Sequence, residues 1–240
     1  MKKVIISGAG SGLGRSLAKT FARRGWKVAA IDIDIESVRS VVDEIKTVGG
    51  EGFAEYCDIS DPASIEALRT RVEKEWGGAD VLINNAGVGA GGSVLNVSEQ
   101  DLRYVFNTNF FGSIRMIQAF VPYMMERNSG HVINISSIAA YVSPPDMAAY
   151  NMSKMAVISM SECLSNELQA GATSVSEQGH DSCQNVRGSD QRTDLQTDGE
   201  SKAFYISSIR RHNFKLREAT GSPFHSAVSG TPNSLIAHNR

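Results

Sequence analysis

The chain has 240 residues with 24 basic and 26 acidic side chains, a net charge of −2 and three cysteines. This length suits one sizeable domain or two small ones. The balanced charge argues against a nucleic-acid-binding protein, which normally carries a basic patch or stripe. No apolar stretch approaches the roughly 18 residues of a membrane span, and the apolar run near the start is too short for a signal peptide. The widely spaced Cys57, Cys163 and Cys183 favour free thiols, so we expect a cytoplasmic protein.

The composition changes near residue 170. In residues 171–240, 19 of 70 residues are apolar, or 27 %, against about 46 % of residues 1–170. The later segment also holds 11 serines, with 8 basic and 7 acidic residues. Such a composition is more typical of a disordered segment than of a core. We therefore predict a folded domain over residues 1–170 and an atypical, polar, poorly ordered segment over residues 171–240.

Short apolar runs alternate with amphipathic segments along the first part. The predicted strands are 3–7, 27–32, 52–57, 79–84 and 131–136, and the predicted helices are 12–25, 35–48, 62–76, 99–127 and 147–170. This alternation indicates βαβ units and a parallel sheet covered on both faces. Right-handed crossovers then predict an α/β, doubly wound, Rossmann-like sheet of strand order 3-2-1-4-5.

A glycine-rich loop joins the first predicted strand to the first predicted helix. Its sequence is Ser7-Gly8-Ala9-Gly10-Ser11-Gly12-Leu13-Gly14. Glycines at such a position allow a tight turn and close approach of a pyrophosphate, which the helix N-terminus stabilises. The loop therefore indicates a dinucleotide site, with a plain glycine-rich turn as the alternative.

Asp32 ends the second predicted strand, 20 residues beyond Gly12. A carboxylate there can accept hydrogen bonds from an adenosine ribose and would repel a 2′-phosphate. No Lys or Arg lies beside Asp32 or within the glycine loop, so we expect NAD rather than NADP as the cofactor. The alternatives are a solvated acid at a strand end and Asp34 in the same role.

Tyr150 and Lys154 are four residues apart near the start of the last predicted helix, and so share one face. A free tyrosine has a pKa of about 10, and a nearby ammonium favours the phenolate. When a hydride moves between a nicotinamide and an alcohol carbon, a proton must also move at the substrate oxygen. The pair therefore suits the interconversion of an alcohol and a carbonyl compound.

Together, the motifs of residues 1–170 resemble those of the short-chain dehydrogenase/reductase family. They are G-x3-G-x-G at Gly8, Gly12 and Gly14, then Asp58, Asn84-Asn85-Ala86-Gly87, Asn109, Ser137 and Tyr150-x3-Lys154. They occur in the family order, and Ser137 precedes Tyr150 by the family interval of 13 residues. Ser7 stands where the family usually has Thr, which also supplies a hydroxyl.

The resemblance implies four catalytic residues. Tyr150 would be the general acid and base, and Lys154 would support it and bind the nicotinamide ribose. Ser137 would hold the substrate oxygen, and Asn109 would keep a water for a proton relay. Without Tyr150 and Lys154, Ser137 reads as a strand-end hydroxyl and Asn109 as a satisfied polar group in a helix.

The resemblance also implies the cofactor-binding set. Besides Asp32, Tyr150 and Lys154, its members are Ser7, Gly8, Gly12, Leu13, Gly14, Asp58, Asn85, Ala86 and Gly87. Asp58 would contact the adenine, and Asn84 would brace the central strands. His180 and Cys183 have the spacing of metal ligands, but no second pair of ligands follows them at a suitable spacing. We therefore expect no metal site.

The resemblance ends near residue 170, where the family continues with a sixth strand and a Pro-Gly turn. Here only residues 203–209 can supply a strand. Without a sixth strand, the strand at 131–136 would expose an apolar edge. We hypothesise that residues 171–240 are a replaced terminus, as a shifted reading frame would produce.

Two functions remain open from the sequence. The first is an NAD-dependent dehydrogenase or reductase acting on a small or medium apolar secondary alcohol or ketone. The second is an NAD-binding protein of the same fold without turnover, its substrate segment having been lost. Family members usually pair through the helices at 99–127 and 147–170, so a homodimer or homotetramer is expected, without nucleic-acid or membrane partners.

Overall fold

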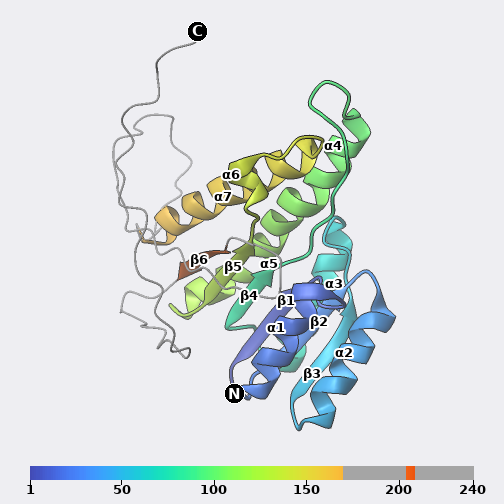
Figure 1. Ribbon diagram of the computed structural model, residues 1–240. Helices are drawn as coiled ribbons and strands as arrows, with labels where there is room; N and C mark the ends of the chain where they lie inside the picture. The colour runs from blue at the N-terminus through green and yellow to red at the C-terminus, as the bar shows by residue number, and fades with distance from the viewer. Residues whose placement is uncertain (170–203, 209–240) are drawn as a thin grey trace, which may run out of the picture.

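Six strands form one sheet in the computed structural model, which describes residues 1–169 and 204–208 (Figure 1). They are β1 (Lys3–Ser7), β2 (Lys27–Asp32), β3 (Glu51–Tyr56), β4 (Val81–Asn84), β5 (His131–Ile135) and β6 (Phe204–Ser208). The order across the sheet is β3-β2-β1-β4-β5-β6, and the first five strands are parallel. The predicted Rossmann-like order 3-2-1-4-5 is confirmed.

The sixth strand comes from the single segment that the sequence offered for it. β6 pairs antiparallel with β5, with Ile133 opposite Ile206. The edge of β5 is therefore covered by an antiparallel strand, which adds to the five parallel strands that the sequence predicts. One strand of the sheet thus comes from beyond residue 170. The rest of the segment that the sequence predicts to be poorly ordered lies outside the described residues, which exclude 170–203 and 209–240.

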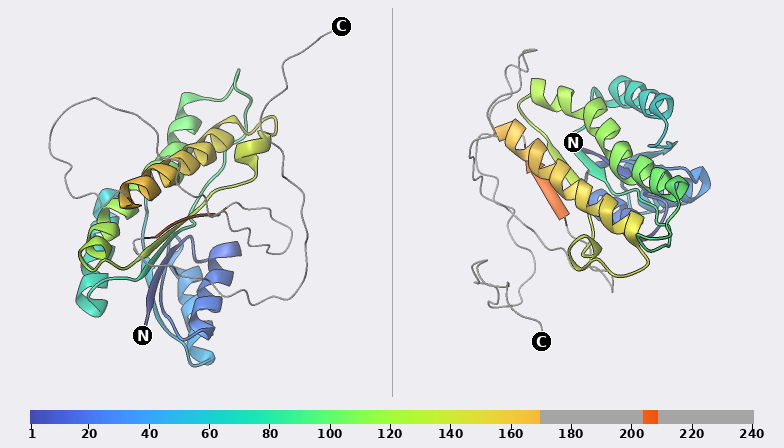
Figure 2. Two further views of the ribbon diagram at one scale, coloured as in Figure 1. Left: turned by 90° about the vertical axis from the view of Figure 1, so that its left-hand side faces the viewer. Right: turned by 90° about the horizontal axis from the view of Figure 1, so that it is seen from above.

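Helices cover both faces of the sheet (Figure 2). α1 (Gly12–Arg23) and α2 (Ile35–Thr47) lie on one face, and α3 (Pro62–Trp76), α5 (Ser113–Glu126) and α7 (Ala148–Gln169) lie on the other. Side chains of β1 alternate between the two cores, with Val4 and Ile6 packed toward α1 and α2 and Ile5 packed toward α3 and α5. This alternation follows from the two-residue period of a strand buried on both faces.

The predicted helix at 99–127 contains a π-helical segment. It consists of α4 (Glu99–Phe106), a π-helical turn η1 (Asn107–Gly112) and α5. A short helix, α6 (Ala139–Val142), also precedes α7. π turns of this kind occur frequently at functional sites, and this one contains Asn109. Within residues 1–169 and 204–208, no helix combines the length and apolar character needed to span a membrane.

Candidate active site

The predicted site residues gather where the parallel strands end. The glycine loop follows β1, Asp32 ends β2, residues 85–87 follow β4, and Ser137 follows β5. The carboxyl ends of neighbouring parallel strands lie at one edge of a sheet, which is where ligands bind in open α/β folds.

Ser7 and Asn85 join the glycine loop to the loop after β4. The Ser7 hydroxyl accepts the backbone N–H groups of Asn85 at 3.0 Å and Ala86 at 3.1 Å, and donates to the Ile83 carbonyl at 3.3 Å. The Asn85 amide donates to the carbonyls of Ser7 at 2.9 Å and Gly8 at 3.1 Å. Ser7 is fully buried, so its hydroxyl holds the loop after β4 from the interior of the protein.

The geometry of the glycine loop fits a pyrophosphate. A Cβ atom on Gly14 would lie 2.0 Å from the Gly8 carbonyl oxygen, so α1 can approach β1 this closely only with glycine there. Gly12 has φ +49°, and open space surrounds the position of its missing Cβ. Leu13 packs its side chain in the core, which leaves its backbone for a ligand.

The N-terminus of α1 lacks the side-chain cap that α2, α3 and α4 have. Ser11 makes no capping hydrogen bond and the first turn holds no acid, whereas Asp34, Asp61 and Ser98 cap α2, α3 and α4. The first N–H groups of α1 are therefore suited to donate hydrogen bonds to an anion, which the positive end of the helix dipole also attracts.

Asp32 and Asp34 have different surroundings, although they lie two residues apart. The Gly10 N–H donates to Asp32 Oδ2 at 3.1 Å, so this carboxylate lies against the glycine loop. Asp34 accepts the N–H groups of Glu36 and Ser37, and hydrogen bonds from Ser37 hold the pKa of its carboxyl below the ordinary value. Asp34 is thus a helix cap.

Two further polar residues stand at strand ends. Asp58, after β3, is half-buried and accepts the Ser60 N–H at 2.8 Å. Asn84 donates to the side-chain oxygen of Asn134 at 2.9 Å, and both residues are buried. The predicted brace between the central strands is confirmed.

Tyr150 and Lys154 lie in the first turns of α7. The Lys154 ammonium is 5.7 Å from the centroid of the Tyr150 ring and donates to the Ile135 carbonyl at 2.9 Å. A Cβ on Gly87 would lie 3.3 Å from the same nitrogen, so the loop after β4 closes over it. Lys154 is 5 % exposed, so water screens its charge little.

Ser137 stands two residues beyond the carbonyl that anchors Lys154. It is 7 % exposed, and its hydroxyl accepts the Ala139 N–H at 3.2 Å. Asn109 is 1 % exposed, and its side chain forms hydrogen bonds with the backbone of Val88 and with the Ser153 hydroxyl. The sequence reasoning overlooked Ser153, although it directly precedes Lys154.

No group of three or more His, Cys, Asp or Glu residues within the described ranges could hold a metal ion. His180 and Cys183 lie outside those ranges.

A doubly wound parallel sheet with a glycine loop between β1 and α1 is the architecture of the dinucleotide-binding Rossmann class. Within that class, the sequence model of the family described as short chain dehydrogenase matches residues 2–177. The chain belongs to this family of oxidoreductases with an NAD(P)-binding fold.

Several relatives have oxidoreductase names. The chain is 38 % identical to the probable oxidoreductase EphD of Mycobacterium tuberculosis H37Rv, across 70 % of this chain but only 28 % of that protein. It is 35 % identical to the 2,3-dihydro-2,3-dihydroxybenzoate dehydrogenase of Bacillus subtilis, across 70 % of this chain and 64 % of that enzyme. The chain thus matches less than two thirds of the length of these two relatives.

Solved structures include complexes with either cofactor. A short-chain dehydrogenase/reductase of Burkholderia phymatum in complex with NAD has 37 % identity and a TM-score of 0.68, covering 70 % of this chain and 60 % of that one. A metagenomic short-chain oxidoreductase in complex with NADP has 33 % identity and a TM-score of 0.68, covering 71 % and 77 %.

Proposed function

We propose that the protein transfers a hydride between NAD(H) and a secondary alcohol or ketone, with Tyr150 as general acid and base. The observation that carries this proposal is the buried Lys154 ammonium, 5.7 Å from the centroid of the Tyr150 ring. Beside this ammonium, Tyr150 would take the hydroxyl proton of an alcohol during oxidation and return it during reduction. The bound nicotinamide supplies the hydride acceptor or donor.

The other residues of the site have supporting roles in this proposal. The Ser137 hydroxyl holds and polarises the substrate oxygen, and Asn109 belongs to the proton relay. Residues 1–170 act as the cofactor-binding and catalytic domain, to whose sheet β6 adds a strand.

We further propose NAD as the preferred cofactor. The Asp32 carboxylate lies against Gly10, within the loop that would hold the pyrophosphate. A 2′-phosphate beside this carboxylate would meet a like charge, and residues 7–14 contain no Lys or Arg to offset it. Asp58 would contact the adenine, while Ala86 and Gly87 would offer backbone to the cofactor.

The loops beside Tyr150 support a proposal for the substrate class. A β-bridge joins the loop after β4 to the loop before α7, since the Gly92 N–H donates to the Asp146 carbonyl at 2.9 Å and the Ala148 N–H donates to the Gly92 carbonyl at 3.1 Å. Pro144, Pro145 and Met147 lie in or next to this bridge. This apolar wall favours a small or medium apolar alcohol.

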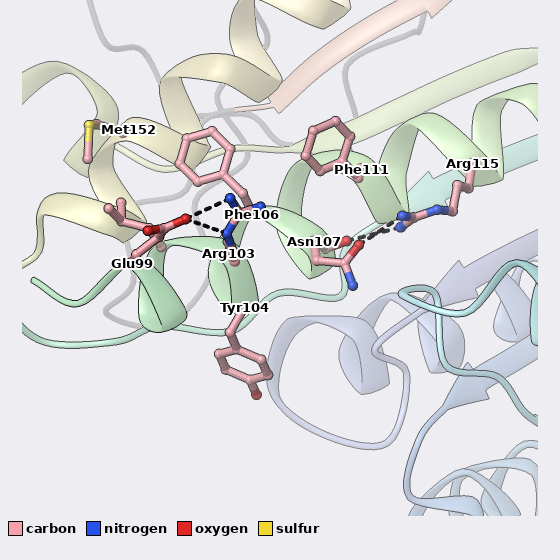
Figure 3. A pocket seen from close by; sticks show the side chains of 9 residues that line it. Glu99, Arg103, Tyr104, Phe106, Asn107, Phe111, Arg115 and Met152 are labelled. Atoms are coloured by element: carbon pink, nitrogen blue, oxygen red, sulfur yellow. Dashed lines mark hydrogen bonds and ion pairs between the residues drawn. The ribbon is translucent and has the colours of Figure 1, made fainter.

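A second copy of the chain is the partner that we propose. A groove of about 820 Å³ runs over α4, η1 and α7 and is lined by side chains such as Phe106, Phe111 and Met152 (Figure 3). Of these lining residues, Phe111 is 47 % and Met152 is 41 % exposed. Aromatic and methionine side chains gathered on one face are typical of a protein interface. We expect a homodimer or homotetramer, which light scattering after size-exclusion chromatography would detect.

Turnover tests the proposed function. We expect purified protein with NAD and a panel of secondary alcohols to gain absorbance at 340 nm, and Tyr150→Phe to abolish the gain while still binding NAD. Binding of NAD by the wild type without turnover on any alcohol or ketone would support the non-catalytic alternative. The dehydrogenase and oxidoreductase names of the relatives do not favour that alternative.

A further inference from the structure

Ser153 lies between Tyr150 and Lys154 in α7 and is completely buried. Its hydroxyl donates to the Tyr150 carbonyl at 2.8 Å and accepts Nδ2 of Asn109 at 2.9 Å. We propose that Ser153 is a positioning residue, which fixes the Tyr150–Lys154 turn relative to the π-helical turn η1. This proposal rests on the proposed function, because it takes Tyr150 to be the general acid and base.

The direction of each hydrogen bond follows from the backbone of Val88. Its N–H can only donate, so it selects Oδ1 of Asn109, at 2.8 Å. Its carbonyl can only accept, so it selects Nδ2, at 2.9 Å. The second hydrogen of Nδ2 is then directed to Ser153, whose own proton is directed to the Tyr150 carbonyl. This position therefore needs a side chain that both accepts and donates, as a hydroxyl does.

The Lys154 ammonium lies close to the Asn109 side chain. A Cβ on Gly87 would lie 3.2 Å from Asn109 Oδ1 and 3.3 Å from Lys154 Nζ. The loop after β4, the π turn and the Lys154 ammonium are therefore packed together around Gly87. Lys154 is also anchored to β5 through the Ile135 carbonyl. Without the Ser153 hydroxyl, one hydrogen of the buried Asn109 amide loses its acceptor, and the hydrogen-bonded link from η1 to the Tyr150 turn is lost. A catalytic group displaced by about 1 Å can cost roughly 100-fold in rate.

The chain contains a matched control on the same helix. Ser161 is 2 % exposed, donates to the Val157 carbonyl at 2.6 Å and accepts Nδ2 of Asn134 at 2.9 Å. It thus has the same pattern of one backbone carbonyl and one asparagine amide, two turns beyond Lys154. Ser161→Ala removes equivalent hydrogen bonds without touching the Tyr150 turn.

Steady-state kinetics of the full chain test the proposal. We expect Ser153→Ala to lower kcat by at least about tenfold, with the Kd for NAD within about twofold of the wild type. Ser153→Thr, which keeps the hydroxyl, should recover most of kcat, and Ser161→Ala should leave kcat within about twofold. A normal kcat in Ser153→Ala, or equal losses in Ser153→Ala and Ser161→Ala, would overturn the proposal.

A spectroscopic readout separates this proposal from the proposed function. In protein made with 13C-labelled tyrosine, the Tyr150 ring signal is identified by its loss in Tyr150→Phe. We expect that signal to move in Ser153→Ala and to stay in Ser161→Ala, whether or not the wild type turns over any alcohol. An unmoved Tyr150 signal in Ser153→Ala overturns the positioning role even in an active enzyme. If Ser153→Ala fails to fold, Ser153→Cys serves in its place, since a thiol is a weak donor of similar size.

Discussion

The side chain of Asn109 forms two hydrogen bonds with the backbone of a single residue, Val88. The Val88 N–H donates to Oδ1 at 2.8 Å, and Nδ2 donates to the Val88 carbonyl at 2.9 Å. In the same π turn, the Asn109 carbonyl accepts the Ser113 hydroxyl at 2.8 Å. This buried amide therefore anchors the loop that carries Gly87 to the π turn.

Asn109→Asp should destabilise the protein by about 2–4 kcal/mol at pH 7. A carboxylate cannot donate to the Val88 carbonyl or to Ser153, and its charge would be buried at a position that is 1 % exposed. Urea unfolding followed by circular dichroism would measure the loss.

The control for this prediction is Asn107→Asp in the same π turn. Asn107 is half-buried, and its Oδ1 accepts Arg115 Nη2 at 2.8 Å, a bond that a carboxylate keeps. We expect a change below about 0.5 kcal/mol there. Equal losses at positions 107 and 109 would contradict the account of the buried amide.

The sequence revealed the parts of the fold that depend on local pattern. β1 and α1 follow from a buried apolar run, a glycine loop and helical spacing, all within about 20 residues. The π turn could not be predicted, because the apolar spacing of the flanking helices continues through it and a single wider turn leaves no clear signature. β6 pairs with a strand about 70 residues earlier, so its place depends on long-range contacts. Ser153 is recognisable only once the position of Asn109 is known.

Asp32→Ala should reverse or erase the preference for NAD. Removing the carboxylate takes away the proposed acceptor for the ribose and the charge that repels a 2′-phosphate. We expect the ratio of kcat/KM for NAD to that for NADP to fall by about 10- to 100-fold, the worth of one charge-assisted hydrogen bond.

Asp34→Ala is the control for the cofactor prediction. It removes the side-chain cap of α2 two residues away, so it should lower Tm but leave the cofactor ratio unchanged. A ratio that changes equally in both variants, or in neither, would show that Asp32 does not select the cofactor.

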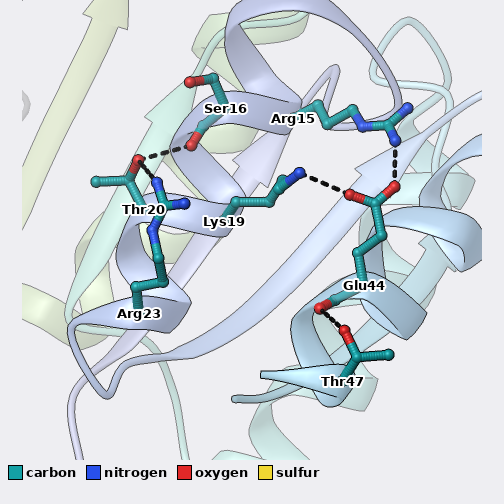
Figure 4. Close-up of polar contacts among 7 residues, drawn as sticks. All are labelled: Arg15, Ser16, Lys19, Thr20, Arg23, Glu44 and Thr47. Atoms are coloured by element: carbon teal, nitrogen blue, oxygen red, sulfur yellow. Dashed lines mark hydrogen bonds and ion pairs between the residues drawn. The ribbon is translucent and has the colours of Figure 1, made fainter. Parts of the chain in front are cut away.

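Glu44 joins α1 to α2 in a pH-dependent manner (Figure 4). It accepts Lys19 Nζ at 2.7 Å and is ion-paired with Arg15. The Lys19 hydrogen bond, aided by the charge of Arg15, holds the pKa of Glu44 below its ordinary value. Because the folded state has the lower pKa, the bridge stabilises the protein above the ordinary pKa of about 4.3, and this stabilisation is lost as pH falls through the folded-state pKa.

Glu44→Gln should therefore lower Tm at pH 7, by no more than about 3 °C since the pair is partly exposed, and should have less effect at pH 3. Added salt should reduce the difference at pH 7. Glu36→Gln, which breaks the more exposed pair with Arg39, should change Tm less. A Tm difference for Glu44→Gln that is the same at pH 3 and pH 7 would rule out this ionic origin.

Cys57 should resist alkylation in the native protein, whereas Cys163 should react. Cys57 follows β3 and is 2 % exposed, and burial raises the pKa of its thiol to about 11. At pH 8 only about one molecule in a thousand then carries the reactive thiolate, and the reagent also lacks access to it. Cys163 is exposed on α7. Peptide mapping by mass spectrometry after iodoacetamide at pH 8 should find the modification at Cys163 and not at Cys57 until urea is added, with Cys163→Ser as the control. Equal labelling of both cysteines without urea would mean that the end of β3, where Asp58 stands, opens readily in solution.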